Sequence, residues 1–519
     1  MASSILARRH FLGAALGAVA TAGCNGEVSW GDPIDPPVTD RVKRALDQLD
    51  GQVRAQMRRT GVPGVAVAVV HEGRLVYAQG MGVRRLGSSL AVDADTVFQL
   101  ASVSKSVGAT VVAQQVGQRR VSWDTRVQQG LPWWTLEDAD AAQRITVGDM
   151  YAHRSGLPGQ AGDALEELGY SQRQILERLR YLPLRPVGTQ YAYSNFGLTT
   201  GAEAVAAIAG QSWAALSQQA VYGPLGMTQT SSLFADFEAR ANRAAGHLRV
   251  NGVWQAGPVR RPDAQSAAGG VSSTVRDMAR WMTMLLDEGR FEGRQVVDAQ
   301  ALRTALSPQM LQSPAGNGEP ARYYGFGFNV GVSEAGRTTY SHSGAFGTGS
   351  ATSFTVMPEL KLGIVVLTNG MPIGVPEIVV SQFLDQVEWG RQRQDWESIW
   401  TKRLAPIMQP HGELAGKTRP PFPRPPRPLG AYVGSYANRF YGPAQVSLQT
   451  GGGGLQVSLG SQRMLLSHWD GEVFSFVPEG DSPGSLSKAT LDGNQLTLEY
   501  FDDVLTPAGV SAGIGRFSR

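Results

Sequence analysis

The chain has 519 residues, a net charge of +3 and the composition of an ordinary globular protein, with 42% hydrophobic and 18% charged residues. This length exceeds what one hydrophobic core usually serves, so we expect more than one domain. The small net charge by itself neither favours nor excludes a nucleic-acid partner. The one cysteine, Cys24, excludes an internal disulfide and a cysteine-based zinc site, and it leaves the rest of the chain without a cysteine nucleophile.

The first 24 residues have the pattern of an export signal. Arg8 and Arg9 supply a positively charged start, residues 13–20 form a short apolar run, and small residues lead to Cys24. This pattern resembles a bacterial twin-arginine signal that ends in a lipobox, although Thr21 stands where leucine is usual. A buried N-terminal helix is the alternative, and the short run and its flanks disfavour it.

Export would place the protein in the bacterial cell envelope, in the periplasm, after folding in the cytoplasm. Cys24 would then become the lipid-carrying first residue of the mature protein, and the lipid would attach the protein to the membrane. The polar, proline-containing residues 25–39 would serve as a tether.

The next segments predict a helix and then a β-hairpin. Residues 40–60 carry apolar side chains on one helical face, and Thr39 or Asp40 can cap this helix. Two apolar stretches follow, at residues 65–70 and 75–79, and a turn signal separates them.

The middle of the chain, residues 102–284, is mainly helical in pattern, and strand signals return after it. Residues 353–357 and 362–367 predict two strands around a turn, and residues 376–404 predict a further helix. Strands at both ends thus enclose a helical middle. We expect residues 40–405 to form an α/β (α+β) domain, in which an antiparallel sheet is flanked by terminal helices and carries an all-α insertion.

The last part of the chain has a different pattern. The prolines and arginines of residues 419–428 predict a stiff, extended linker within residues 406–429, although such a segment can also bind a proline-recognition module. Short alternating apolar stretches follow, at residues 446–448, 455–459, 473–477 and 495–500. Residues 430–519 should therefore form a separate all-β domain, either a small barrel or a sandwich.

Ser102 and Lys105 are the first candidates for chemistry. They stand three positions apart at the expected start of a helix, so their side chains share one face and can touch. A serine hydroxyl becomes a nucleophile when a base removes its proton, and a lysine with a lowered pKa can do so. The motif alone is weak evidence, because Ser485 and Lys488 repeat the spacing in a segment of short alternating stretches.

Two further elements could complete such a site. Tyr193 and Asn195 form a Tyr-x-Asn element, in which a phenol near a lysine ammonium would have a lowered pKa and could act as a base. His342 and Gly344 form a His-x-Gly element before a glycine-rich stretch whose backbone N–H groups can approach a ligand. Taken singly, a surface aromatic turn and a capping or core histidine also explain these elements.

The three elements in this order resemble the motifs of the serine β-lactamase and penicillin-binding protein family, in particular its class C β-lactamases, D-alanyl-D-alanine carboxypeptidases and related esterases. Four more segments match that family: residues 98–102 (FQLAS), 151–158 (YAHRSGLP), 223–227 (GPLGM) and 268–274 (AGGVSST). The resemblance covers residues 40–405. The all-β domain resembles the small lipocalin-like domains appended to some members.

The resemblance implies a role for each residue. Ser102 would be the nucleophile that forms an acyl-enzyme, and Lys105 and Tyr193 would share the task of general base. Asn195 would orient the substrate and Lys105. The backbone N–H groups of Ser102 and Ala345 would form the oxyanion hole, where fixed donors stabilise developing negative charge.

His342 would line the substrate site together with Gly344, and it replaces the lysine of the family's K-T-G element. A lysine there attracts the carboxylate of a β-lactam or of a peptide terminus, whereas histidine is mostly neutral at pH 7. The resemblance therefore implies weak or absent β-lactamase activity and favours an esterase or a D-amino-acid peptidase. Arg154 is a second departure, because the family usually has threonine at this position.

Two functions are consistent with these residues. The first is an exported serine hydrolase that cleaves an ester or amide through an acyl-enzyme on Ser102. The second is a non-catalytic receptor for cell-wall fragments or a partner, which the altered third element and the extra domain would suit. The complete set of catalytic side chains favours the hydrolase. We expect a small-molecule or peptide substrate, no nucleic-acid partner, and no metal or organic cofactor.

Overall fold

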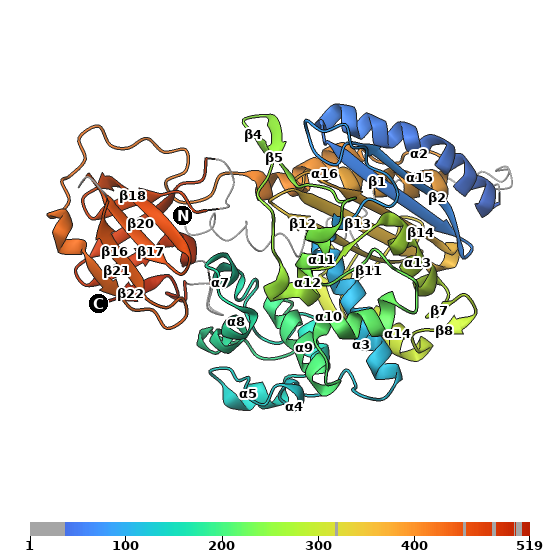
Figure 1. The fold of residues 1–519 in the computed structure, drawn as a ribbon, viewed down its shortest axis with the longest axis horizontal. Coiled ribbons are helices and arrows are strands. Elements are labelled where there is room, and N and C mark those ends of the chain that lie inside the picture. Colours follow the sequence, from blue (N-terminus) through green and yellow to red (C-terminus); the bar gives the residue numbers. More distant parts are fainter. Residues whose placement is uncertain (1–36, 317–319, 450–452, 480–483, 503, 505–510) are drawn as a thin grey trace.

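The computed structural model describes residues 37–519 except for short gaps at residues 317–319, 450–452, 480–483, 503 and 505–510. The expected export signal, Cys24 and most of the expected tether lie outside the described residues. Within the described part of the chain, no helix has both the length and the apolar character to cross a membrane. The described chain forms a large mixed body and a smaller all-β body (Figure 1).

The large body is built on an eight-stranded sheet in which every neighbouring pair is antiparallel. In spatial order its strands are β2 (Arg74–Gly82), β1 (Gly64–His71), β14 (Leu362–Thr368), β13 (Ser350–Met357), β12 (Thr338–Phe346), β11 (Asn329–Val332), β10 (Arg322–Tyr324) and β9 (Met310–Ser313). The early hairpin thus lies beside the late strands, and Val65 of β1 faces Thr368 of β14. The predicted antiparallel sheet is confirmed.

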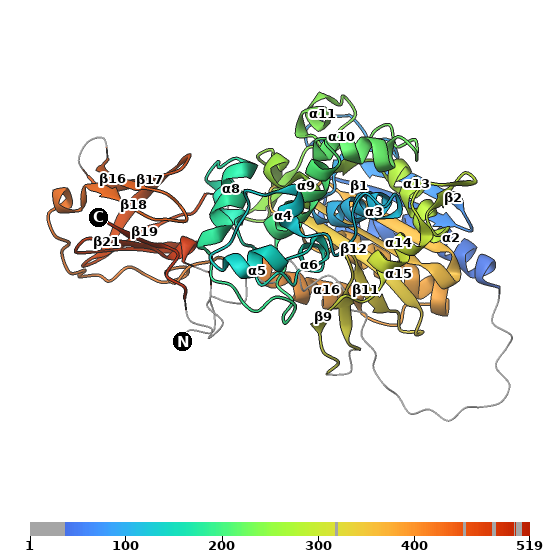
Figure 2. The same ribbon diagram turned by 90° about the horizontal axis from the view of Figure 1, so that it is seen from below.

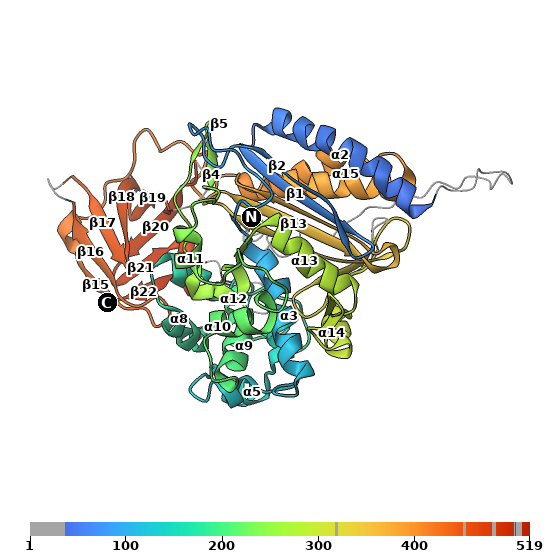
Figure 3. The same ribbon diagram turned by 45° about the vertical axis from the view of Figure 1, so that its right-hand side comes forward.

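Helices cover both faces of this sheet because its central strands are apolar on both sides. α2 (Val38–Thr60) and α15 (Val375–Trp389) pack together on one face, and α3 (Ser104–Gly117) and α13 (Val275–Leu286) cover the other (Figures 1 and 3). All eight residues of β1 are buried, and they alternate between the two apolar cores as the two-residue period of a strand requires.

The N-terminal helix begins earlier than predicted. α2 starts at Val38, and Pro37 occupies the position before its first turn. Neither Thr39 nor Asp40 is the cap, so that detail of the prediction is wrong. Proline suits such a start because its missing N–H would have had no helical partner.

The helix predicted for residues 376–404 is two helices. α15 ends at Gly390, which has a left-handed φ of 69°, and α16 (Trp396–Leu404) begins after a short turn. The strands β9–β11 were not predicted. These strands precede β12, so the late strand region begins before His342. His342 itself lies inside β12 and not at the start of that region.

The insertion between β2 and the late strands is largely helical, as predicted. Its helices are α4 (Val127–Gly130), α5 (Ala139–Arg144), α6 (Val147–Tyr151), α7 (Asp163–Glu167), α8 (Gln172–Arg178), α9 (Asn195–Ile208), α10 (Trp213–Ser217), α11 (Phe234–Ala239) and α12 (Ser266–Gly269). The short hairpins β4 (His247–Val250)–β5 (Val253–Ala256) and β7 (Arg290–Phe291)–β8 (Arg294–Gln295) and the helix α14 (Ala299–Leu306) complete the large body. β3 (Phe98–Gln99) pairs with β6 (Ser272–Ser273) beside Ser102.

The smaller body is one eight-stranded sheet with its strands in chain order: β15 (Gly434–Tyr436), β16 (Ala444–Leu448), β17 (Leu455–Leu459), β18 (Gln462–Asp470), β19 (Val473–Phe476), β20 (Ser487–Asp492), β21 (Gln495–Leu498) and β22 (Arg516–Ser518). An antiparallel bridge between Ala437 and Ser518 joins the first and last strands. The sheet is therefore a nearly closed barrel and not a sandwich. β15, β18, β20 and β22 were not predicted.

The barrel docks on α7 and α8 of the insertion (Figures 1 and 2). Tyr170 Oη donates to the Tyr441 carbonyl at 2.5 Å, and Arg178 Nη1 donates to the Phe440 carbonyl at 2.8 Å. Apolar residues from the insertion and from the barrel form one continuous buried cluster. The proline-rich residues 419–428 contain no helix or strand, and they follow the barrel surface, where Arg424 pairs with Asp470 at 2.8 Å.

Candidate active site

Ser102 lies in a single 3₁₀ turn, Ala101–Val103, directly before α3 and in contact with β12 and β13. Ala101 has a φ of +48°, a left-handed conformation that is unfavourable for a residue with a side chain. Such strain persists where the surrounding structure enforces it, and it occurs often at functional sites. The turn therefore holds Ser102 in one fixed position at the junction of the sheet and the insertion.

Lys105 reaches back from the first turn of α3 to Ser102, as its spacing predicts. Its amine lies 3.1 Å from Ser102 Oγ, 2.6 Å from Asn195 Oδ1 and 2.9 Å from the Ala268 carbonyl oxygen. The side chain is completely buried. Burial lowers the pKa of Lys105 to about 7, and the Asp163 carboxylate opposes part of that change.

The partners of Lys105 favour a neutral amine that acts as a base. An amide oxygen and a carbonyl oxygen can only accept hydrogen bonds. A neutral amine donates its two N–H groups to Asn195 and Ala268, and its lone pair then faces Ser102. In that arrangement the Ser102 hydroxyl donates to Lys105, which is the geometry for proton removal.

Asn195 is the first residue of α9, and Asp163 fixes the orientation of its amide. Asn195 Nδ2 donates to Asp163 Oδ2 at 2.9 Å, which leaves Oδ1 turned toward Lys105. Burial and the nearby Glu166 carboxyl raise the pKa of Asp163 to about 7, against the lowering effects of Asn195 and Lys105. Sequence reasoning missed Asp163, because nothing in its neighbourhood along the chain shows that it interacts with Asn195, 32 positions later, and with Lys105, 58 positions earlier.

Tyr193 lies beside the nucleophile and the lysine. Lys105 Nζ is 4.6 Å from the centre of its ring, and its buried hydroxyl oxygen has no hydrogen-bond partner among the described residues. The nearby Ser102 hydroxyl lowers the pKa of the phenol in part. Burial nevertheless raises the pKa of Tyr193 well above its usual value. The expectation that a nearby ammonium would depress this pKa is wrong, because the cost of burying a phenolate is the larger effect. Lys105 is the stronger candidate for the base.

His153 connects the YAHRSGLP segment (residues 151–158) to the active site. Its carbonyl accepts from the Ala192 N–H at 2.8 Å, and its Nδ1 accepts from the Ser194 N–H at 3.2 Å. Its ring also packs 4.5 Å from the Tyr193 ring, measured between centroids. This buried histidine thus holds both sides of the loop that carries Tyr193 to Asn195.

His342 is buried on β12 and held in one tautomer. Its Nδ1 lies 2.7 Å from the Ser343 carbonyl, which can only accept, so Nδ1 carries the proton. Its Nε2 then accepts from the Tyr324 hydroxyl at 2.9 Å. Burial and the proximity of Lys105 lower the pKa of His342 to about 3, so the ring is neutral at pH 7. Tyr324, on the unpredicted strand β10, was not identified from the sequence.

Gly344 allows β12 to pass directly against the nucleophile turn. A Cβ at this position would lie 2.2 Å from the Leu100 carbonyl oxygen and 2.8 Å from the Ser102 nitrogen. Only glycine fits such a backbone approach. The next residue, Ala345, pairs with Ala351 of β13 and continues the strand beside the same turn. The structure therefore brings together all the residues predicted for this site.

Three residues noted in the sequence have structural partners. Arg154 Nε pairs with Asp149 at 2.8 Å, and its Nη1 donates to the Gln309 carbonyl at 2.9 Å. In the repeated motif, Lys488 pairs with Glu413 at 2.6 Å, and Ser485 Oγ accepts from the His411 N–H at 2.9 Å. The described residues contain no group of three His, Cys, Asp or Glu side chains arranged to hold a metal ion.

Comparison with known proteins identifies the family. The family model described as Beta-lactamase matches residues 49–385, which is well over half of the chain. The chain belongs to this family. It is a serine hydrolase of the β-lactamase and penicillin-binding protein kind, as the resemblance predicted. Residues 418–491, in the linker and barrel, match a domain of unknown function (DUF3471).

Named relatives support the same assignment. Penicillin-binding protein 4 of Amycolatopsis lactamdurans is 30% identical over 63% of this chain and 86% of its own length. The unguisins hydrolase ungD of Aspergillus violaceofuscus (strain CBS 115571) is 24% identical over 90% of this chain and 88% of its own length. The D-alanyl-D-alanine-carboxypeptidase/endopeptidase AmpH of Escherichia coli (strain K12) is 24% identical over 66% of this chain and 87% of its own length.

A solved structure shows the same fold. The octameric penicillin-binding protein homologue from Pyrococcus abyssi matches with a TM-score of 0.58 and 18% sequence identity. The match covers 88% of this chain and 98% of that one, so it includes both the large body and part of the smaller one.

Proposed function

We propose that this hydrolase cleaves an ester or amide, as an esterase or D-amino-acid peptidase does, by transferring the acyl group to Ser102. The observation that carries the proposal is the setting of Lys105. Its buried amine has two neighbours that can only accept, Asn195 Oδ1 and the Ala268 carbonyl, and its remaining neighbour is Ser102 Oγ. A lysine placed in this way can take the serine proton itself, so the reaction needs no second general base.

The first half-reaction then has a simple sequence. Lys105 accepts the proton of Ser102, and Oγ bonds to the substrate carbonyl carbon. The carbonyl oxygen becomes an oxyanion that the N–H groups of Ser102 and Ala345 would stabilise. The intermediate collapses by breaking the bond to the leaving oxygen or nitrogen, which takes the proton from Lys105. The product is an acyl-enzyme on Ser102.

The second half-reaction repeats these steps with water. Water gives a proton to Lys105 while its oxygen bonds to the acyl carbon, and Ser102 leaves with that proton. Tyr193 would keep its phenol proton throughout, since burial raises its pKa. In that state its hydroxyl is a donor that can assist the departing group.

The polar residues around the nucleophile support a substrate whose binding does not depend on an ion pair with a substrate carboxylate. His342 is neutral at pH 7, and it stands where a cationic lysine would bind a carboxylate. Arg154 is paired with Asp149, and Arg260 is paired with Glu166. The relatives named as an unguisins hydrolase and as a carboxypeptidase/endopeptidase are consistent with ester or amide cleavage.

The test compares matched substrates with the purified full chain. We would measure kcat/KM for p-nitrophenyl butyrate, for an N-acyl-D-alanyl-D-alanine peptide with a free carboxylate, for the same peptide as its C-terminal amide, and for nitrocefin. We expect turnover of the ester, nitrocefin hydrolysis that is weak or absent, and no more than about a threefold preference between the free and amidated peptides, because a neutral His342 gives little electrostatic discrimination. A preference above tenfold for the free carboxylate, or no labelling of Ser102 by a fluorophosphonate, would contradict the proposal.

We also propose that the protein is exported and held at the cell envelope through a lipid on Cys24. The twin arginines, the apolar run and the small residues before Cys24 support this proposal. Metabolic labelling with a fatty-acid analogue should mark the wild-type chain and not Cys24→Ala. Equal labelling of both chains, or a wild-type chain that stays in the cytoplasm, would contradict it.

A further inference from the structure

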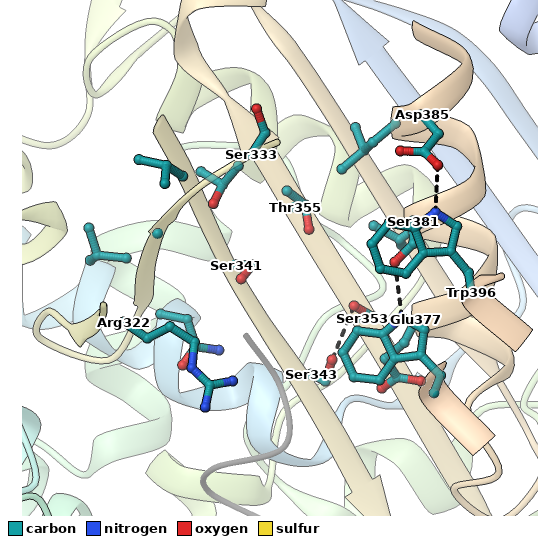
Figure 4. A pocket seen from close by; sticks show the side chains of 18 of the residues that line it. Arg322, Ser333, Ser341, Ser343, Ser353, Thr355, Glu377, Ser381, Asp385 and Trp396 are labelled. Atoms are coloured by element: carbon teal, nitrogen blue, oxygen red, sulfur yellow. Dashed lines mark hydrogen bonds between the residues drawn. The ribbon is translucent and has the colours of Figure 1, made fainter. Parts of the chain in front are cut away.

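A polar pocket lies behind the catalytic strand, on the face of the sheet opposite Ser102. Along β12, His342 and Gly344 face the nucleophile, so Ser343 between them points to the other side. There the pocket opens between strands β9–β13 and the helices α15 and α16 (Figure 4). It encloses about 810 Å³ of empty space, including its mouth, and none of the proposed catalytic residues lines it.

The side of this pocket that β12 and β13 form carries hydroxyl groups, whereas the neighbouring strand β14 is apolar at the facing positions. Its hydroxyl-bearing residues on β12 and β13 are Thr339, Ser341, Ser343, Ser353 and Thr355. Ser353 and Thr355 stand directly opposite Val366 and Ile364 of β14, which pack into the apolar core under α2 and α15. Small polar side chains at these positions leave space under the helices and line it with donors and acceptors.

Glu377, in the first turn of α15, places a carboxyl in this pocket. Its residue is only 5% exposed, and its Oε2 atom has no hydrogen-bond partner among the described residues. Burial raises the pKa of Glu377 to about 7. The Glu377 N–H and the nearby Ser343 hydroxyl lower this pKa in part. The buried Oε2 atom still lacks a partner, which is unfavourable, so this oxygen is available to a positively charged or hydrogen-bonding ligand.

The other two carboxyls of the pocket already have partners. Asp385 accepts from Trp396 Nε1 at 2.7 Å and from the Arg393 N–H at 2.8 Å. Glu388 accepts from Ser333 Oγ at 2.7 Å and from Arg337 Nη1 at 2.9 Å. Glu377 is therefore the carboxyl through which the pocket would recognise a ligand.

The remaining walls place a cation and aromatic rings around the same space. Arg322 lies across the pocket from Glu377 (Figure 4), where its Nε donates to Ser313 Oγ at 2.8 Å. Trp396 and Trp400 line the same pocket, and Trp396 lies on the Glu377 side of it (Figure 4). Tryptophan rings offer a flat apolar surface beside which a carbon ring can pack.

The geometry points to a second ligand site in this pocket, which takes a small ligand carrying a protonated amine among several hydroxyl groups, the chemistry of an amino sugar. The amine would pair with Glu377. The ligand hydroxyls would exchange hydrogen bonds with the row on β12 and β13, and the ring would pack near the tryptophans. A neutral sugar would leave the carboxyl without its partner, so the amine should decide the affinity.

The experiment uses isothermal titration calorimetry of the full chain with D-glucosamine at pH 7, with D-glucose and N-acetyl-D-glucosamine as uncharged comparison ligands. We expect one glucosamine per chain, and binding at least tenfold weaker for both uncharged sugars. Glu377→Gln should weaken glucosamine binding at least tenfold, because the amide keeps the shape and loses the charge. Glu292→Gln, an exposed carboxyl in another turn, is the matched control and should bind like the wild type.

Two further measurements separate this site from the catalytic one and from misfolding. Enzyme acylated at Ser102 with a fluorophosphonate should bind glucosamine unchanged. Ser353→Ala, which removes one hydroxyl from the wall, should weaken binding while thermal unfolding shows an intact fold. Absence of glucosamine binding at millimolar concentration, equal binding by Glu377→Gln, or loss of binding on acylation of Ser102 would each overturn the inference.

Discussion

The chain contains the same Ser-x-x-Lys spacing twice, and the structure places the two copies in opposite surroundings. Lys105 is completely buried, and its amine touches Ser102 and two oxygen acceptors. Lys488 is partly exposed and forms an ion pair with Glu413. The comparison teaches that the spacing supplies only proximity, whereas burial and the choice of neighbours supply the chemistry.

Local backbone conformation accounts for part of the difference. Ser102 and Lys105 lie in a 3₁₀ turn and the helix that follows, so residues three apart share a face. Lys488 lies in β20, an extended segment. Ser485 lies two residues before β20 and outside any helix, so no helical turn brings its side chain onto one face with Lys488.

The sharpest test of the comparison is to remove each serine. Ser102→Ala should abolish fluorophosphonate labelling and lower kcat by at least about 10⁴-fold, because no other group can form the acyl-enzyme. Ser485→Ala should leave labelling and kcat unchanged, since this hydroxyl only accepts from the His411 N–H. Labelling gels and steady-state kinetics measure both effects. Residual labelling of Ser102→Ala would show that the nucleophile is a different residue.

Replacing each lysine in turn should give almost as large a difference in kcat. Lys105→Met keeps most of the buried volume and removes the base, so kcat should fall by about 10²- to 10⁴-fold. Lys488→Met should leave kcat unchanged. If Lys105→Met retained more than a tenth of the wild-type rate, Tyr193 would have to be the base.

A smaller effect should appear in the pH dependence of kcat/KM. Lys105 acts as a base only when it is neutral, and burial lowers its pKa to about 7, so activity should rise as the pH increases through about 7. The Asp163 carboxylate raises the pKa of Lys105. Asp163→Asn removes that charge, so the rising limb should move to lower pH. Asp492→Asn, an exposed barrel carboxyl, is the control. An unchanged limb in Asp163→Asn would show that the lysine does not control it.

The smallest effect concerns stability. Lys488→Met removes a partly exposed ion pair, and such pairs contribute about 0–1 kcal/mol. Urea unfolding should show a loss within that range, and the loss should diminish at high salt. A loss above about 2 kcal/mol would mean that this copy has a structural role that its contacts do not reveal.

Sequence patterns predicted those parts of the site that depend on local order along the chain. The proximity of Ser102 and Lys105 follows from helical geometry, and the glycine-rich stretch from Gly344 was expected to bring backbone N–H groups to a ligand. The three motifs in order indicated the family. By contrast, Asp163 acts through its contact with Asn195, and Tyr324 acts through its contact with His342. The residues of each pair are well separated along the chain. No local pattern reports such contacts.

The elements of the fold also fall into those that local sequence patterns predicted and those that they missed. The early hairpin, the paired strands around residue 358 and the change of pattern after the proline-rich linker were visible in the sequence. The short strands β9–β11 were missed because they are three or four residues long and irregular in pattern. The break between α15 and α16 was missed although the sequence marks it, with Gly390 at the end of α15 and only polar residues at 391–395.

The sequence by itself thus determined which residue types are present, their spacing and the family to which the chain belongs. Tertiary structure decided which of them are buried and what they touch. Burial set the pKa of Lys105 low and that of Tyr193 high, which favours Lys105 as the base where the sequence had left the choice between the two open. The physical reason is that the cost of burying a charge depends on the whole surrounding fold, and no stretch of neighbouring residues contains that information.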